Sequence, residues 1–268
     1  MDYADIRNKM FDSAEQFWWG SIGISVSLLI LSVLSILLNF PSSIVALSGL
    51  YILITPILRL FLRRTSRSFS EKGDVCRRTI MYADGLGISI PEFQAKLIRS
   101  WVVQTELNKA PFNPPYFDSK KKAGPVRLMD NLAESTYFTN FLASKVESIL
   151  SVALLLIVLI TVSSIYLATS FNFTQSQLFQ LNKLILVVAT FLLSEDVFEH
   201  YLAFRRLANE SGVIYREAST LASKKNLKPE EALQKCEEYT TLLASSPPLP
   251  FLLYRYFRDA LDKAYKGK

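Results

Sequence analysis

Two long segments without a charged residue dominate the hydrophobic pattern of the chain. Residues 17–58 form the first segment and residues 148–182 form the second. A bilayer core about 30 Å thick requires roughly 20 apolar residues in helical conformation. Each segment is too long for one crossing and has about the length that two crossings need. The pattern therefore predicts two helical hairpins that span a membrane.

The two hairpins divide into four expected spans. These cover residues 17–40, 42–62, 148–169 and 178–198, of which the last is the least apolar. Short uncharged turns at residues 39–43 and 170–176 connect the two members of each hairpin. We expect an all-α, polytopic membrane protein with four transmembrane helices and a helical cytosolic module formed by the segments outside the spans.

Charged segments before, between and after the hairpins complete the expected organisation. It comprises a cytosolic N-terminus at residues 1–16, a transmembrane hairpin at 17–62, a cytosolic helical insert at 63–147, a second hairpin at 148–198 and a cytosolic helical tail at 199–268. Within the insert, Pro91 followed by Glu92 predicts a helix start. A second helix is predicted to begin at Pro125 and to run unbroken into the third span. Residues 84–87 predict a turn.

The tail is expected to begin as a continuation of the fourth span. Its apolar positions recur at alternating three- and four-residue steps, namely Phe204, Leu207, Ile214, Ala218 and Leu221, with Ser211 and His200 also in register. Such a seam packs either on helices of the same chain or between subunits. Another helix is predicted from Pro229, and a last one over residues 251–265 lies either on the membrane surface or on the cytosolic module.

Composition and charge support the division into apolar spans and polar segments. Half of the 268 residues are hydrophobic although a fifth are charged, and the net charge is +6. Basic residues are concentrated in the insert and the tail, whereas both turns are uncharged. The positive-inside rule therefore places both termini and the insert in the cytosol. The positive charge then faces anionic lipid of the bilayer, so binding to DNA or RNA is not expected.

Signatures of catalysis are absent from the sequence. The chain has a single histidine, His200, and lacks the phosphate-binding loop that ends in Gly-Lys-Ser/Thr, the Gly-x-Ser-x-Gly elbow and the His-Glu-x-x-His motif. Cys76 and Cys236 have no second cysteine or histidine at metal-ligand spacing, which predicts reduced structural thiols. We expect neither enzymatic activity nor a cofactor or metal.

Polar residues enter the fourth expected span on one helical face. They are Gln180, Lys183, Thr190 and Ser194. Lys183 lies near the outer end of the span and can extend its ammonium group to the membrane surface. That explanation does not account for Thr190 and Ser194, so we interpret the stripe as the lining of a water-filled pore. Four mostly apolar spans cannot enclose a wide pore, and activity is therefore expected to require an oligomer of identical subunits.

Four stretches outside the spans are distinctive. They are YADGLGI at residues 82–88, NPPYFDS at 113–119, ESTYFT at 134–139 and SPPLPFLLYR at 246–255. With the order of hairpins, insert and tail over nearly the whole chain, they resemble the SMODS-associated four-transmembrane effectors, pore-formers of bacterial antiphage systems that signal through cyclic nucleotides. The resemblance implies an effector in the bacterial inner membrane that damages this membrane when infection is signalled.

Two other classes of function compete with the effector. A non-channel membrane adaptor, whose cytosolic module binds a protein partner, is the main alternative. A small transporter is disfavoured because the hairpins show no inverted repeat and the spans lack paired carboxylates.

A cyclic oligonucleotide acting as the cytosolic signal would require cations for its phosphates and aromatic rings for its bases. The insert offers both, and the candidate ligand-binding residues are Arg77, Arg78, Tyr82, Tyr116, Phe117, Lys120 and Arg127. The competing interpretation of these residues is lipid-facing charge and ordinary aromatic residues of the core, with a protein as the trigger.

Overall fold

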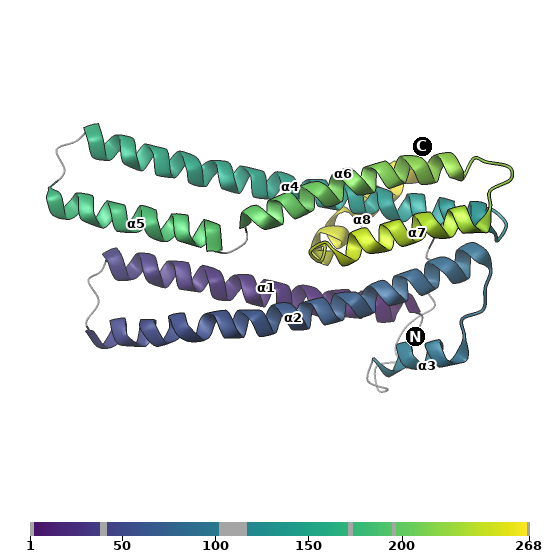
Figure 1. Ribbon diagram of the computed structural model, residues 1–268, viewed down its shortest axis with the longest axis horizontal. Coiled ribbons are helices and arrows are strands. Elements are labelled where there is room, and N and C mark those ends of the chain that lie inside the picture. The colour runs from purple at the N-terminus through teal and green to yellow at the C-terminus, as the bar shows by residue number, and fades with distance from the viewer. Residues whose placement is uncertain (1–2, 38–41, 102–116, 171–173, 195–196, 267–268) are drawn as a thin grey trace. The chain divides into compact units, whose positions relative to one another are not determined.

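The computed structural model describes residues 3–37, 42–101, 117–170, 174–194 and 197–266, and within them every regular element is an α-helix (Figure 1). The helices are α1 (Tyr3–Leu37), α2 (Ser42–Leu86), α3 (Glu92–Ser100), α4 (Pro125–Ser170), α5 (Gln175–Ser194), α6 (Val197–Leu221), α7 (Pro229–Ala244) and α8 (Phe251–Lys266). The all-α class is confirmed. The starts of α3, α4, α7 and α8 lie where the sequence placed them.

Two of the described helices are long and apolar enough to cross a membrane, Tyr3–Ile36 and Pro125–Ser163. In the most apolar stretch of 18 residues of each, only 11% and 6% of the residues are buried. A core helix of a soluble protein would be mostly buried instead. Length, composition and exposure therefore indicate association with a membrane, whereas the arrangement of four spans stays a prediction.

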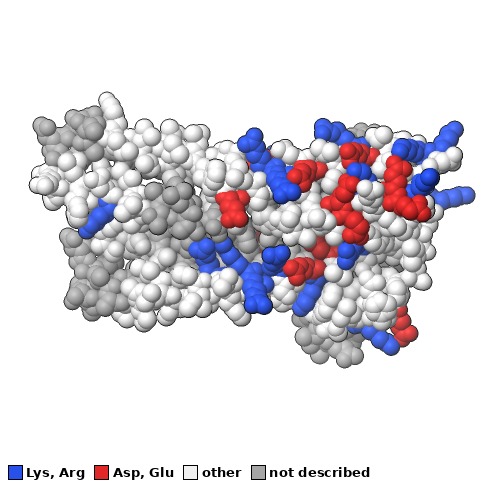
Figure 2. All heavy atoms as spheres, in the orientation of Figure 1, with Lys and Arg blue, Asp and Glu red and all other residues white. Residues whose placement is uncertain are grey.

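The chain divides into two compact units. The polar unit comprises Met1–Gln16, Ser66–Ser144 and Ala203–Lys268, and the apolar unit comprises Phe17–Thr65 and Lys145–Leu202. In Figure 2, basic and acidic side chains gather over one part of the surface, whereas another part is largely uncharged. Because α1, α2 and α4 each contribute residues to both units, the backbone passes from one unit to the other in helical conformation (Figure 1).

In the apolar unit, α1 and α2 pack as a hairpin. A Cβ atom added to Gly20 would lie 3.7 Å from Leu62 Cδ1, and the hydroxyl oxygens of Ser27 and Tyr51 lie 2.5 Å apart. Other hydroxyls of these helices bond to a carbonyl one turn back; Thr55, for example, donates to the Tyr51 carbonyl at 2.7 Å. Such bonds satisfy hydroxyl groups where no water is available.

Large apolar side chains remain exposed around this unit. The most exposed include Leu53 and Ile57 on α2, at 71% each, Val162 on α4 at 58% and Leu186 on α5 at 67%. Soluble monomers rarely expose contiguous apolar patches larger than a few hundred Å². These surfaces therefore require an apolar environment such as the interior of a bilayer.

The core of the polar unit joins segments that are far apart in sequence. Ile6 and Met10 of α1 pack with Cys76 of α2 and Ile98 of α3 in one buried cluster. The Ser66 hydroxyl donates to the carbonyl of Ala14 at 2.7 Å and ties α2 to α1. The first turns of α1 therefore belong to a folded bundle.

The seam expected in the tail is buried within the chain. Six of its positions lie below 8% exposure, namely Phe204, Leu207, Ser211, Ile214, Ala218 and Leu221. His200, which the sequence also placed in register, is only half-buried. The Asn140 side chain of α4 donates to the carbonyl of Ala208 at 2.7 Å, and a Cβ atom on Gly212 would lie 3.0 Å from the same amide. Of the two arrangements left open by the sequence, the structure has the seam packed on the chain's own helix α4.

The last helix, α8, packs on the polar unit as well. Leu261 is 2% exposed, and the ring of Phe257 lies 5.5 Å from that of Phe141 on α4. The carboxylate of Glu15 on α1 accepts the backbone N–H of Leu252 at 3.0 and 3.2 Å, which satisfies a free donor in the first turn of α8. The interpretation that this helix packs on the cytosolic module agrees with these contacts.

We expect Gly85→Ala to destabilise the polar unit by about 1–3 kcal/mol, the usual cost of overpacking. A Cβ atom at Gly85 would lie 2.8 Å from the backbone Cα of Leu128, where α2 meets the start of α4. Gly23→Ala in α1 is the control, since its Cβ would meet no atom within 4 Å. The measurement is chemical denaturation of both variants in detergent. Equal stability of Gly85→Ala and the parent would contradict this close approach.

Both cysteines are free and fully buried. Burial raises the pKa of the Cys76 thiol to about 11 and that of the Cys236 thiol to about 12. Because the thiolate is the reactive form, we expect neither to react with Ellman's reagent at pH 8 in the folded protein and both to react after unfolding. Rapid reaction of either thiol in the folded protein would contradict the packing around it.

Candidate functional site

The polar stripe expected to line a pore lies on α5 of the apolar unit. Gln180 and Lys183 are exposed, and the Lys183 ammonium lies 4.4 Å from the centroid of the Phe179 ring one turn earlier. This cation–π contact keeps the ammonium close to the helix surface. Thr190 and Ser194 belong to α5, but their side chains lie outside the part of the structure that is described. A pore lined by all four residues stays a prediction.

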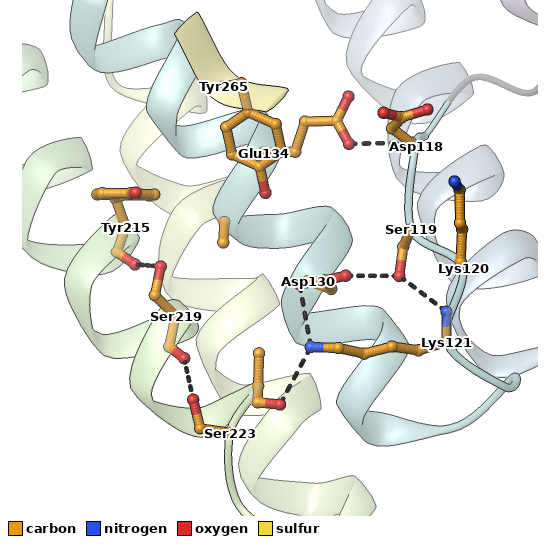
Figure 3. A pocket seen from close by; sticks show the side chains of 12 residues that line it. Asp118, Ser119, Lys120, Lys121, Asp130, Glu134, Tyr215, Ser219, Ser223 and Tyr265 are labelled. Atoms are coloured by element: carbon orange, nitrogen blue, oxygen red, sulfur yellow. Dashed lines mark hydrogen bonds and ion pairs between the residues drawn. The ribbon is translucent and has the colours of Figure 1, made fainter. Parts of the chain in front are cut away.

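The polar unit contains a cavity of about 650 Å³ (Figure 3). The loop before α4 lies on one side of it and α6 on the other, with α4 behind them and Tyr265 of α8 at one end. Its lining consists of Asp118, Ser119, Lys120, Lys121, Asp130, Ala133, Glu134, Tyr215, Ser219, Ala222, Ser223 and Tyr265. Segments separated by more than a hundred residues therefore meet around one polar space.

Hydrogen bonds fix the loop against α4 and α6. The Ser119 hydroxyl donates to Asp130 Oδ2 at 2.6 Å, and Lys121 Nζ donates to Asp130 Oδ1 at 3.1 Å and to the carbonyl of Ala222 at 3.2 Å. The backbone N–H of Asp118 donates to Glu134 Oε2 at 3.1 Å. The cavity wall is therefore held by specific polar contacts.

Among the described residues that line the cavity, carboxylates outnumber ammonium groups. Three acidic side chains face two lysines among the lining residues. Burial raises the pKa of the Tyr265 phenol above its usual range, and the charges of Glu134 and Asp130 raise it further.

Three of the residues expected to bind a nucleotide lie together on α2 against α7. The guanidinium of Arg77 is buried, with Nε 3.3 Å from Asp74 Oδ1 and its central carbon 4.6 Å from the centroid of the Tyr239 ring. Tyr82 donates a hydrogen bond of 2.8 Å to Glu237, and Arg78 lies 3.9 Å from the same carboxylate. These polar groups face α7 and tie it to α2.

The other candidates lie around the loop before α4. Arg127 binds the Asp84 carboxylate with two hydrogen bonds of 3.0 and 2.6 Å and donates to the carbonyl of Lys121 at 3.1 Å. Phe117 is 3% exposed, and Lys120 is exposed and lines the cavity. Tyr116 lies outside the described residues. The structure thus separates the candidates into an α2 group and a loop group, and binding of a cyclic oligonucleotide stays a prediction.

Sequence reasoning missed the acidic and aromatic residues of the cavity. Asp130 and Glu134 are spaced four residues apart in a predicted helix, which places both on one face, and this was the available signal. Tyr215 and Tyr265 come from the distant tail, and no local pattern indicates that they approach Glu134. Among the described residues, no cluster of three or more His, Cys, Asp or Glu side chains is arranged to hold a metal ion.

Comparisons with known proteins do not extend the assignment. No protein-family model, curated protein or solved structure matches the chain. The resemblance to the SMODS-associated four-transmembrane effectors therefore stays a prediction that depends on the stretches named above and on the order of hairpins, insert and tail.

Proposed function

We propose that this chain is an effector of the bacterial inner membrane that forms a pore, or disrupts the membrane, when a cytosolic signal acts on its polar unit. In this proposal the apolar unit comprises four transmembrane helices in two hairpins, and both termini and the polar unit lie in the cytosol. The proposal combines the family resemblance with the exposed apolar surface of one unit and the dense polar contacts of the other.

The continuity of three helices is the observation that carries the proposal. On α2, exposed leucines and isoleucines such as Leu53 and Ile57 are followed, in the same helix, by residues packed in the polar unit such as Cys76 and Met81. The helices α1 and α4 pass between units in the same way. A change in packing of the polar unit is thereby passed to membrane-embedded segments without an intervening flexible loop.

Two of the stretches that support the family resemblance contact each other inside the polar unit, and a third contacts the residue before α4. Phe138, in the stretch at residues 134–139, lies 6.4 Å from Tyr254, in the stretch at 246–255, between ring centroids. The stretch at 82–88 contains Gly85, whose carbonyl accepts the N–H of Gly124 at 2.8 Å. These stretches therefore connect α2, α4 and α8, as expected for a module that responds to a signal.

Oligomerisation is part of the proposal because one chain supplies little polar surface to the membrane interior. After the first turn of α5, three of the described and exposed residues carry an amide or a charged group, and no others do. They are Gln180, Asn182 and Lys183. Several copies of the polar stripe are needed to line a water-filled path through the membrane. The partners expected are the lipid bilayer and further copies of the same chain.

The experiment is ion flux from liposomes of bacterial inner-membrane lipid that contain the purified full chain. We expect the protein, once activated by a cyclic di- or trinucleotide from a panel, to release entrapped ions, and its induced expression with the signal to depolarise cells. Liposomes without protein are the control. The result that contradicts pore formation is a protein that inserts into the liposomes but passes no ions under any condition. If such a protein also binds a protein partner through its polar unit, it is the membrane adaptor considered above.

A further inference from the structure

One side of the last helix, α8, is exposed although its opposite side is packed. Leu252 and Tyr256 are 64% and 79% exposed, and Lys263 is exposed as well. These positions are four and seven residues apart, and this spacing places them on one side of an α-helix. We call them the exposed face of α8. The buried Leu261 lies on the other side, against the rest of the polar unit.

The contacts of α8 with α1 and α4 lie close to the points where these two helices enter the apolar unit. The backbone N–H of Leu252 donates to Glu15, and the apolar unit begins two residues after Glu15 on α1. The ring of Phe257 lies 5.5 Å from that of Phe141, and the apolar unit begins four residues after Phe141 on α4. With the rise of an α-helix, these distances along the two helix axes are about 3 Å and about 6 Å.

The helix α8 crosses α4 and does not run along it. The ring of Phe138 on α4 lies 6.4 Å from that of Tyr254 and 5.9 Å from that of Tyr265, between centroids. These two tyrosines are separated by three turns of α8, which is roughly 16 Å along its axis. Two helices that run side by side would bring them to distant positions on α4, whereas here both reach one ring.

This crossing determines how α8 lies relative to a bilayer that α4 spans. Transmembrane helices are tilted by only about 20° from the bilayer normal on average. A helix that crosses α4 steeply, just outside the apolar unit, therefore runs along the membrane surface.

The composition of α8 is that of helices that lie at the membrane surface. Such helices present apolar residues to the lipid and carry basic residues at the boundary with water. Tyrosine is enriched at this level because its ring is apolar and its hydroxyl group is polar. The sequence of α8 contains four basic and two acidic residues, and a net positive charge attracts anionic headgroups.

We propose that the exposed face of α8 binds the phospholipid surface of the bilayer while the opposite face stays packed on the polar unit. The two arrangements expected for this helix from the sequence are then met by its two faces. The inference rests on the membrane placement of the apolar unit in the proposed function, and it does not depend on pore formation. In this arrangement α8 holds the polar unit against the membrane beside the points where α1 and α4 enter it.

Fluorescence quenching of the full chain in liposomes of phosphatidylethanolamine and phosphatidylglycerol tests the proposal. The variant Tyr256→Cys is labelled with a nitrobenzoxadiazole group, and the parent protein treated in the same way is the blank, since both native cysteines are buried. One quencher is a nitroxide attached to a lipid acyl chain near the headgroup, and the other is iodide in the water. We expect the nitroxide lipid to quench the label at 256 strongly and iodide to quench it weakly.

Two matched positions calibrate this measurement. Phe93→Cys places the label on another exposed aromatic position of the polar unit, at 74% exposure. Its helix, α3, contacts α2 at Thr79, well beyond the apolar unit, which ends at Thr65 on α2. Val162→Cys places the label on the exposed surface of the apolar unit. The nitroxide lipid should quench the labels at 256 and 162 severalfold more than the label at 93, and iodide should show the reverse order.

Three results would overturn the proposal, and they differ in what they leave intact. If iodide quenches the labels at 256 and 93 equally while the label at 162 is quenched by the nitroxide lipid, the exposed face lies in water although the apolar unit is in the membrane. If the label at 256 is shielded from both quenchers, the face is assigned to contact with a second copy of the chain. If the label at 162 is not quenched by the nitroxide lipid, the membrane placement itself is wrong, and the proposed function fails with it.

Discussion

Replacing Lys183 with glutamate is expected to shift the ion selectivity of the activated protein toward cations. In an oligomer, each subunit would contribute one ammonium group at this level of α5, and a ring of positive charge repels cations and favours anions. The substitution inverts the sign of the ring. Reversal potentials from single-channel recordings under a salt gradient measure the effect. Arg206→Glu is the control, since it makes the same charge change on an exposed side chain of α6.

Making the inner part of the same stripe apolar is expected to close the path. The double substitution Thr190→Leu and Ser194→Leu removes the hydroxyl groups that would keep this part wet, and apolar constrictions stop conduction by dewetting. Lys183→Leu should leave the helix at least as stable in the membrane, because an unpaired cation within a span costs a few kcal/mol. If the Lys183→Glu variant and the double variant conduct like the parent protein while remaining in the membrane, α5 does not line the pore.

Removing one partner of the pair formed by the buried Arg77 and the half-buried Asp74 is expected to destabilise the polar unit by about 3 kcal/mol, whereas removing both should be neutral or stabilising by about 1–4 kcal/mol. The side chain of Arg77 is 7% exposed, and its two terminal nitrogens have no hydrogen-bond partner in the structure. Asp74→Leu would leave this charge without its carboxylate. Asp74→Leu combined with Arg77→Met removes the cost of desolvating both groups.

The pH dependence of stability should differ between the parent protein and the two variants that lack Asp74. Burial raises the pKa of Asp74, although the charge of Arg77 lowers it. A protonated Asp74 still offers an oxygen that accepts from Arg77 Nε, which leucine does not, so protonation favours the folded state although Asp74→Leu does not. This contribution to stability is present below the pKa of the unfolded chain and is lost as the pH rises through the folded pKa. Both variants lack this contribution. If the double variant proved as unstable as Asp74→Leu, the account of the buried pair would be wrong.

Fluorescence of Trp101 provides the measurement for this pair. Trp101 packs against the cluster that contains Cys76, one residue before Arg77. When Trp18 and Trp19 are replaced by phenylalanine, Trp101 is the tryptophan that remains. Its fluorescence during chemical unfolding in detergent then reports on unfolding of the polar unit. The parent protein in the same background is the reference for both variants.

Helix positions were predictable where a local signal marks an end. Pro125 begins a helix because its fixed φ suits the first turn, and α4 runs from it to Ser170 as expected. The turn predicted at residues 84–87 was wrong for its first three residues, because α2 continues to Leu86, and the chain leaves the helix at Gly87, which adopts a φ of 69°. A left-handed residue at a helix end favours glycine, which is the signal that the sequence carried.

Contacts between distant segments were not predictable in the same way. The pattern of six apolar or small positions in α6 indicated a packed face, but a periodic pattern does not name the helix that covers it. Asn140 and Gly212 show that α4 covers it. Arg77 is a residue for which the sequence carried no signal of burial, because an arginine in a charged helix is usually solvated. Contacts with other helices bury its guanidinium against the ring of Tyr239.

We expect the apolar unit to lie in the bilayer and the polar unit to lie in the cytosol. Thiol labelling of intact cells with a membrane-impermeant maleimide tests it directly. The two native cysteines are buried, so cysteines introduced singly at Phe40, Asn172 and Lys120 report on their own positions. We expect labelling from outside at 40 and 172, and labelling at 120 only after the inner membrane is permeabilised. Labelling at 120 in intact cells, or protection at both 40 and 172, would contradict it.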